Sequence, residues 1–307
     1  MANLEVTFLG TSSAAPTKSR GLPSIAITRE GQVTLMDCGE GAQSRFVEFG
    51  LGLNREMLVL ITHLHGDHVN GLLGLLQTMS MSQRIRRLTI VAPQALFDWL
   101  AVTTRVLHIG LSFEVLMVPV RPGVVLRGKD FRIRAARANH SIEAWSFIFE
   151  ELPRPGVFDP EKAISLGIPE GKKWSSLQRG RSVTLKGKKI LPGQVLGPAR
   201  AGRKVGYSGD TRPTKGLASF FTGVDLLIFD STFAAKDAEK AVERKHSTST
   251  EAAQLARDAG AKKLALTHFS ARYRNTGQLL REARKVFENT VAARDGLVLE
   301  VPQRDTV

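Results

Sequence analysis

The sequence is poor in cysteine and has no long hydrophobic run. Its one cysteine, Cys38, excludes an intramolecular disulfide and a cysteine-based zinc site. No apolar stretch approaches the ~20 residues that a membrane span needs, and the N-terminus lacks the charged-then-apolar pattern of a signal peptide. We therefore expect a cytoplasmic protein that makes no contact with a membrane.

Acidic residues are also scarce, since 29 Asp and Glu stand against 43 Lys and Arg, for a net charge of +14. Such a surplus favours a polyanionic partner, above all nucleic acid. Residues 153–204 carry twelve cations and three acids, which places nine of the fourteen surplus charges there. Six prolines and eight glycines interrupt this interval. We expect a protruding, loosely ordered basic arm at 153–204, inserted in a single domain that spans residues 1–307.

Histidine is sparse as well, yet three of the seven histidines lie in the string THLHGDH at residues 62–68. An apolar run at residues 57–61 precedes it and predicts a buried strand. His63 and His65 can be aimed at one ion from a single extended segment, while Asp67 and His68 suit a second ion. Imidazole and carboxylate groups are ligands for zinc. Two such ions, ~3.5–4 Å apart, commonly drive attack on a phosphate or acyl centre.

Three further ligand-type residues each follow a strand-like run: His140, Asp210 and His268. Residues at the ends of several strands of an α/β sheet converge on one rim, where such folds place their sites. The repeated arrangement predicts that these residues join the 62–68 segment in one metal site.

Strand-like and helix-like stretches alternate along the chain, which predicts an α/β sandwich. The expected strands are 4–9, 25–28, 33–36, 58–62, 88–92, 113–119, 131–138, 204–208, 226–230 and 264–267. The expected helices are 41–49, 68–81, 93–107, 248–259 and 277–287. Inside the arm we expect one short helix at 159–166 and one short strand at 183–185.

The chain resembles the metallo-β-lactamase superfamily and, within it, the short form of the tRNase Z family. The motifs that carry the resemblance are FLGTSSAAPT (8–17), DCGEGAQ (37–43), THLHGDH (62–68), NH (139–140), SGDT (208–211), KHST (245–248) and THFS (267–270). The His-Ser-Thr at 246–248 distinguishes this family from thioester hydrolases and lactonases of the superfamily. The resemblance implies an αβ/βα four-layer sandwich.

The resemblance also implies two zinc ions per chain. The first would be held by three histidines: His63, His65 and His140. The second would be held by three other ligands: Asp67, His68 and His268. Asp210 would bridge the ions, since each of its two carboxylate oxygens can serve one of them.

Two residues are expected to move protons in such a site. Asp67 is the candidate general base, and His246 is the candidate acid because it is the motif histidine left outside the metal shell. Either Glu251 or Asp230 would orient His246. Many relatives have His-Glu-Ala-Thr-Phe where this chain has Phe229-Asp230-Ser231-Thr232-Phe233.

The activity implied is that of a zinc-dependent endoribonuclease. It would cut precursor tRNA after the discriminator base, leaving a 3′-hydroxyl on the tRNA and a 5′-phosphate on the trailer. Relatives act as homodimers, so the resemblance implies that this chain also forms a homodimer. The arm would be the exosite that grips tRNA, through residues Lys172, Lys173, Trp174, Arg179, Arg181, Lys188 and Lys189. Trp174 could instead be a packing residue of the arm.

Other functions fit part of these observations. A nuclease with a large cap between Asp210 and His268 is excluded, because only 57 residues separate the two. A small-molecule hydrolase of thioesters, lactones or cyclic phosphodiesters would leave the basic arm without a purpose. A non-catalytic RNA-binding protein with structural zinc is disfavoured, because structural zinc sites are closed and rarely paired.

Overall fold

The computed structural model describes residues 3–303, which fall into two compact units. Unit 1 consists of the chain up to Phe149 together with Lys204–Pro302. Unit 2 consists of Glu150–Arg203, the segment that joins β10 to β13. The boundaries of unit 2 lie close to those expected for the basic arm. No helix within residues 3–303 is long and apolar enough to cross a membrane.

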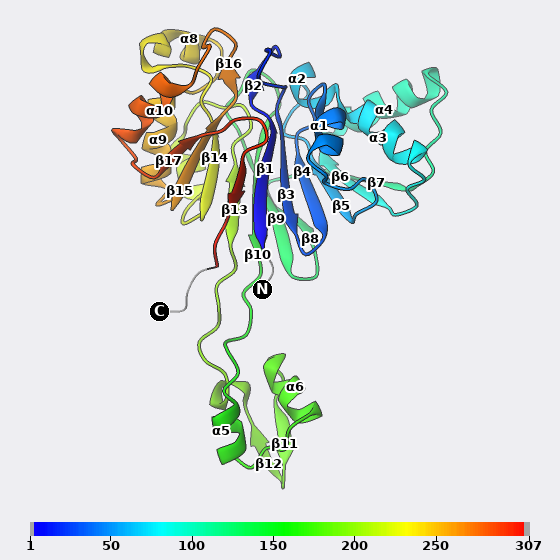
Figure 1. Cartoon of the computed structure of the whole chain (residues 1–307), viewed down its shortest axis with the longest axis vertical. Coiled ribbons are helices and arrows are strands. Elements are labelled where there is room, and N and C mark those ends of the chain that lie inside the picture. The colour runs from blue at the N-terminus through cyan, green and yellow to red at the C-terminus, as the bar shows by residue number, and fades with distance from the viewer. Residues whose placement is uncertain (1–2, 304–307) are drawn as a thin grey trace. The chain divides into compact units, whose positions relative to one another are not determined.

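Two mixed sheets form the centre of unit 1 (Figure 1). In spatial order the first contains β18 (Val298–Glu300), β1 (Leu4–Gly10), β3 (Ser24–Arg29), β4 (Gln32–Met36), β5 (Met57–Leu60), β6 (Leu88–Ala92) and β7 (Val115–Pro119). The second contains β17 (Thr290–Ala292), β15 (Lys263–Thr267), β14 (Leu226–Asp230), β13 (Lys204–Tyr207), β10 (Trp145–Glu151), β9 (Phe131–Arg137) and β8 (Gly123–Arg127).

Helices cover the outer faces of both sheets, as Figure 1 shows. The first sheet is covered by α1 (Ala42–Glu48), α3 (Leu72–Met81) and α4 (Gln94–Val106). The second is covered by α7 (Lys215–Phe220), α9 (Ser249–Asp258) and α10 (Gly277–Arg284). Short elements complete the unit: β2 (Ser12–Ser13), α2 (Gly66–Val69), a 3₁₀ turn (Ala235–Asp237), α8 (Ala238–Glu243) and β16 (Phe269–Ser270). The expected four-layer αβ/βα fold is confirmed.

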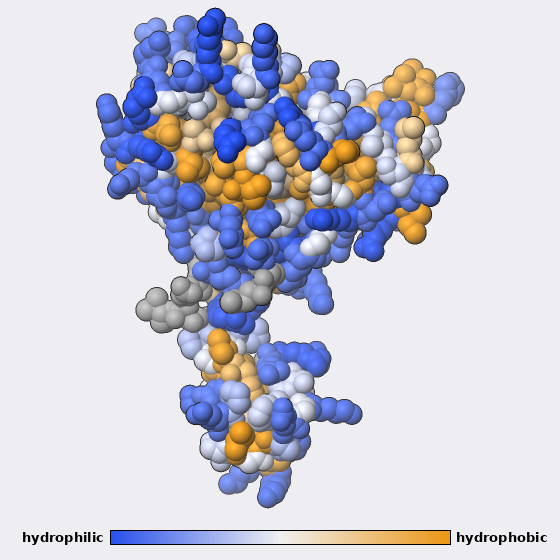
Figure 2. All heavy atoms as spheres, viewed as in Figure 1, coloured by the Kyte–Doolittle hydropathy of each residue, from blue (hydrophilic) through white to orange (hydrophobic). Residues whose placement is uncertain are grey.

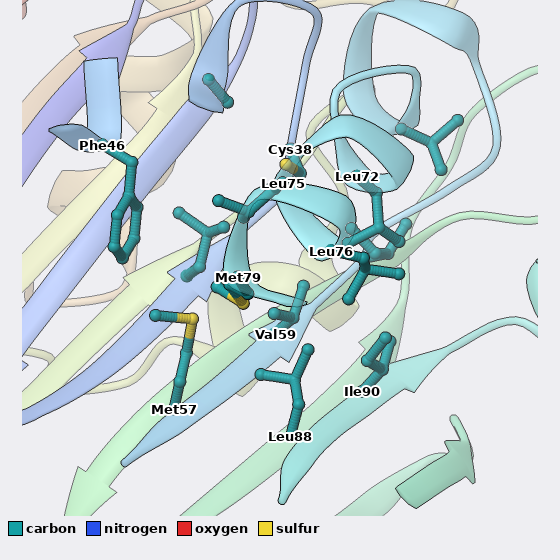
Figure 3. Packing of buried hydrophobic residues seen from close by; sticks show 14 of the residues in the cluster. Cys38, Phe46, Met57, Val59, Leu72, Leu75, Leu76, Met79, Leu88 and Ile90 are labelled. Carbon is teal, nitrogen blue, oxygen red and sulfur yellow. The ribbon is translucent and has the colours of Figure 1, made fainter. Parts of the chain in front are cut away.

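Strand periodicity accounts for the layers. In β5, Met57 and Val59 pack against the helices, whereas Leu58 and Leu60 point into the space between the sheets. Figure 3 shows the outer packing, in which Leu72, Leu75, Leu76 and Met79 of α3 lie over Met57, Val59, Leu88 and Ile90. Each face of the strand is therefore apolar, which explains why these strands are continuous hydrophobic runs rather than alternating ones.

The strand directions bring the candidate site together. Strands β4 to β7 are parallel, and so are β13, β14, β15 and β17. The segments after β5, β13 and β15 hold the predicted ligands other than His140, which follows β9. Figure 1 shows α2, β2 and β16 together at this end of unit 1. This rim is where α/β folds bind their ligands.

Unit 2 is more ordered than the sequence led us to expect. It contains α5 (Pro160–Ser165), α6 (Lys172–Gln178), a β11–β12 hairpin (Val183–Leu185 and Lys188–Ile190) and a 3₁₀ turn (Pro192–Gln194). Five buried apolar side chains form its own core: Ala163, Ile168, Leu177, Ile190 and Val195. The sequence did not reveal this core, because its apolar residues are spread singly among glycines and cations and meet only after the chain folds.

This small core predicts a local effect of mutation. Leu177 is fully buried, so Leu177→Ala should remove about 2–5 kcal/mol from the stability of unit 2. Hydrogen exchange should then quicken in residues 158–196 and remain slow in the strands of unit 1. The control is Leu191→Ala, whose side chain is 53% exposed and whose loss should change exchange little. Equal exchange in the two variants would show that the five residues do not act as a core.

Candidate metal centre

The first ligand group lies where the segment after β5 meets the residue after β9. His63 Nε2 lies 3.1 Å from His65 Nδ1, which in turn lies 3.1 Å from His140 Nε2. Asp210 Oδ2 lies 3.6 Å from His63 Nε2 and 3.9 Å from His140 Nε2. Four ligand atoms therefore face one point, and His63 and Asp210 are buried.

The second ligand group uses the other oxygen of Asp210. His68 Nε2 and His268 Nε2 lie 3.3 Å apart, and each lies 3.3 Å from Asp210 Oδ1. Asp67 Oδ2 lies 3.7 Å from His68 Nε2 and 3.5 Å from His268 Nε2. All seven predicted ligands thus come together in two groups that share Asp210.

The residues fit a pair of divalent cations. Asp210 Oδ1 is buried and has no hydrogen-bond partner among the described residues, which is costly unless a cation satisfies it. Burial lowers the pKa of His63, so its ring stays neutral with a lone pair free for a metal. Nitrogen and carboxylate oxygen ligands without cysteine suit zinc.

The second group demands positive charge. Burial disfavours the protonated form of His268, but the Asp210 carboxylate and hydrogen bonds to Asp230 and Asp67 outweigh it and raise its pKa to about 10. Burial likewise opposes protonation of His68, and the charges of Asp210 and Asp37 raise its pKa. The buried carboxylates therefore attract a cation to this point.

Outer partners hold the second ring nitrogen of four ligand histidines. His63 Nδ1 lies 2.9 Å from Thr62 Oγ1, and His268 Nδ1 lies 2.8 Å from Thr232 Oγ1. His140 Nδ1 lies 3.0 Å from the carbonyl oxygen of Lys245. The fourth contact, His68 Nδ1 to Asp37 Oδ2, is 2.7 Å long. Such contacts orient each ring and fix which nitrogen faces the metal.

Asp37 is the most connected of these partners. Its fully buried carboxylate accepts hydrogen bonds from Thr62 N (2.8 Å), Thr62 Oγ1 (2.9 Å) and Tyr207 Oη (2.8 Å), besides the contact with His68. Next to it, a Cβ on Gly39 would lie 2.3 Å from the carbonyl oxygen of Asp67, so only glycine allows this approach. The sequence placed Asp37 in a motif but did not reveal this role; its position directly after a buried strand was the available signal.

Asp67 is held from outside the ligand segment. The backbone N–H of Ala14 donates to Asp67 Oδ2 over 2.8 Å. Burial opposes ionisation of Asp67, but its hydrogen bond to His268 and the charges of His68 and His268 hold its pKa below the usual range. The ionised carboxylate can bind a cation or accept a proton.

His246 lies beside the ligand groups with an acidic partner of its own. Its Nδ1 lies 2.9 Å from Asp230 Oδ2, while Glu251 instead contacts Thr248 and Arg212. Asp230 also accepts hydrogen bonds from Thr211 N, Thr232 N and Thr232 Oγ1, so we assign it to orientation rather than to metal binding. Burial disfavours a charged His246, yet the charges of Asp230 and Asp210 outweigh it and raise its pKa. The carboxylates of Asp230 and Asp210 therefore favour a protonated imidazole at this position.

The residues expected to bind nucleic acid differ in their exposure and contacts. Lys172, Arg179 and Arg181 line one hollow of about 480 Å³ in unit 2. Lys188 and Lys189 are exposed on β12, and Lys173 Nζ donates to the carbonyl of Thr184 over 3.2 Å. Trp174 Nε1 donates to the carbonyl of Ile168 over 2.9 Å, and its ring packs 5.1 Å from that of Phe158. The packing interpretation of Trp174 therefore matches its surroundings.

Known proteins resemble this chain over its whole length. Ribonuclease Z of Nitrosopumilus maritimus is 47% identical over 298 residues, covering 97% of this chain and 100% of that protein. Ribonuclease Z of Methanothermobacter thermautotrophicus is 42% identical, covering 99% and 98%. The crystal structure of human tRNase Z, short form, matches with a TM-score of 0.72 and 27% identity, covering 97% of this chain and 99% of that one. Two family descriptions match parts of the chain: "Anti-Pycsar protein Apyc1" at residues 4–142 and "Beta-lactamase superfamily domain" at residues 178–269.

The two ligand groups predict the metal content. Purified protein should hold about two zinc ions per chain, because six predicted ligands form two groups around a seventh, Asp210, which faces both. His63→Ala should lose an ion from the first group and His268→Ala one from the second, as measured by elemental analysis. The exposed histidine His108 provides the control, since His108→Ala should keep full occupancy. Full metal content and activity in either ligand variant would refute the assignment.

Proposed function

The chain belongs to the ribonuclease Z family, and we propose that it is a zinc-dependent endoribonuclease that removes the 3′ trailer of precursor tRNA. The cut falls after the discriminator base and leaves a 3′-hydroxyl on the tRNA and a 5′-phosphate on the trailer. One observation carries the proposal: two groups of ligand-type side chains share Asp210, and His246 lies beside them with its Nδ1 2.9 Å from Asp230 Oδ2. Such a site can stabilise both the attacking and the leaving oxygen of a phosphodiester.

The chemistry follows from the positions of the side chains. Two zinc ions held by these ligands would neutralise charge on the scissile phosphate and make water a stronger nucleophile at neutral pH. Asp67, ionised and facing the second ligand group, accepts a proton from the attacking water. The water oxygen forms a bond to phosphorus and remains on the 5′-phosphate of the trailer.

His246 serves the opposite side of the reaction. The bond from phosphorus to the ribose 3′-oxygen breaks, and that oxygen leaves poorly unless it receives a proton. His246 keeps its proton because Asp230 holds Nδ1, which leaves Nε2 to donate. The ring of His246 is 5.2 Å from those of His140 and His268, so the acid lies within reach of a phosphate bound at the metals.

Unit 2 supports RNA as the substrate. It has eleven cations and five acids, a net charge of +6 in about a sixth of the chain, and hydrophilic residues dominate its visible face in Figure 2. We propose that Lys172, Arg179 and Arg181 bind tRNA phosphates, with Lys188 and Lys189 adding to the same basic surface. A small-molecule hydrolase would gain nothing from this charge.

We propose that the chain acts as a homodimer in the cytoplasm. Large apolar side chains are exposed on and near α3 and α4: Met81, Ile85, Val102, Val106 and Leu107. The same end of unit 1 shows hydrophobic residues in Figure 2. Exposed apolar groups of this size are typical of surfaces that bind another protein, which supports self-association.

The role of His246 can be separated from metal binding. His246→Ala should keep its zinc but cleave precursor tRNA ~10²–10⁴-fold more slowly, the usual worth of one proton donor. Hydrolysis of bis(p-nitrophenyl) phosphate should largely survive, because p-nitrophenolate leaves without a proton. Unchanged tRNA cleavage by the variant would remove His246 from the mechanism.

The proposed function has its own test on the unmodified protein. Mapping of the product ends should show a 3′-hydroxyl on the tRNA and a 5′-phosphate on the trailer, and thioester and cyclic-nucleotide substrates should be turned over poorly. A preference for these small substrates would overturn the proposed function.

The charge of unit 2 can be tested without removing it. Replacing Lys172, Arg179 and Arg181 by glutamine should raise KM for precursor tRNA and lower the salt dependence of binding, by roughly one unit of slope per lost phosphate contact. Hydrolysis of bis(p-nitrophenyl) phosphate should not change. A control with the same loss of charge replaces three exposed cations of unit 1: Arg121, Lys129 and Lys285. If the two triple variants bound tRNA alike, the contact surface would lie elsewhere.

A further inference from the structure

Arg212 joins three segments of the candidate active site. Its backbone N–H donates to the carbonyl of Asn139 over 2.9 Å, beside the ligand His140. Its side chain donates through Nη1 to the carbonyl of His246 over 2.6 Å. Arg212 itself lies two residues after the bridging Asp210. One residue therefore connects both sides of the metal centre to the proposed acid.

An ion pair with Glu251 holds the guanidinium group in place. Arg212 Nη1 donates to Glu251 Oε2 over 2.8 Å, and Nη2 contacts Glu251 Oε1, so the pair is bidentate. Glu251 Oε2 also accepts hydrogen bonds from Thr248 N and Thr248 Oγ1, both over 2.9 Å, in a capping box at the start of α9. Bidentate arginine–carboxylate pairs fix direction as well as distance. The guanidinium is thus anchored to a packed helix.

His246 needs such support because it lies in a short strained turn. Lys245 before it has a φ of 57°, in the left-handed region that non-glycine residues rarely adopt. Two residues after it, Thr248 is the N-cap of α9. The His246 backbone is held at its N–H by the carbonyl of Ala241 and at its own carbonyl by Arg212. With Asp230 holding Nδ1, these contacts determine where Nε2 points.

We propose that Arg212, anchored by Glu251, is a positioning residue that aims His246 at the leaving oxygen. This inference rests on the proposed function, because it assumes that His246 donates the proton. Arg212 is only 15% exposed and its side chain is engaged by His246 and Glu251, so it acts through His246 rather than on substrate. A displacement of ~1 Å at a reacting group can cost ~10²-fold in rate.

The substitution Arg212→Lys tests the proposal, since lysine keeps the charge but cannot form the planar fork. On precursor tRNA we expect kcat to fall about 100-fold with KM nearly unchanged. Zinc content and hydrolysis of bis(p-nitrophenyl) phosphate should be retained, because neither depends on the acid. Arg45→Lys, which alters an arginine–glutamate pair on α1, should match the unmodified protein in all four measurements. Parallel losses on both substrates, or loss of zinc, would show a merely structural role and overturn the proposal.

A double-mutant cycle shows whether Arg212 acts through His246. In a His246→Ala background, Arg212→Lys should lower tRNA cleavage by less than about threefold, because the acid that it positions is gone. If the two losses multiplied instead, Arg212 would act independently of His246 and the proposal would fail. The proposed function has a separate test, since cleavage of the trailer by the unmodified protein and the effect of His246→Ala do not depend on Arg212.

Discussion

At one rim of the sandwich, several buried carboxylates need hydrogen-bond donors or cations to offset the cost of burying their charge. Asp210 is buried with one oxygen unpaired by any described hydrogen bond, and Asp37 and Asp230 are buried nearby. An isolated buried carboxylate would cost many kcal/mol, so each needs cations or several hydrogen-bond donors. Asp37 and Asp230 have donors, whereas Asp210 has mainly histidine rings around it. That difference supports the proposed bridging role of Asp210 and a supporting role for Asp37 and Asp230, which contact His68 and His246.

The supports are held by strained backbone and by the packed sheets together. Asp37, Lys245 and His268 all have positive φ angles, 56°, 57° and 62°, although none is glycine. Strain of this kind costs ~1–3 kcal/mol per residue and persists only where surrounding structure enforces it. For Asp37 and His268 the two sheets enforce this conformation, because the strands that lead into these two residues, β4 and β15, are buried on both faces. The packed core thereby fixes the positions of the side chains in the candidate site.

The two units carry different groups of residues: one holds the candidate metal centre and the other holds a dense basic segment. The predicted ligands and the proposed proton donor all belong to unit 1, while the densest basic segment belongs to unit 2. Unit 2 has its own small core and its own hairpin, so its cations are displayed on a folded scaffold. Trp174 contributes to that scaffold through its hydrogen bond to Ile168 and its packing against Phe158.

The sequence by itself determined the ligand types and the strands that carry them, because apolar runs buried on both faces and the residues directly after them are local features. It did not reveal β10, whose run ends in two glutamates, or α6, whose apolar residues are too few to show a period. Only the tertiary structure decided between Asp230 and Glu251, because both lie near His246 in sequence or motif and only packing turns one toward it. Arg212 likewise looks ordinary in the sequence, and Asp37 stands in a motif that does not show which residues it contacts. Their roles arise from contacts between segments that are distant along the chain, and spacing alone does not specify such contacts.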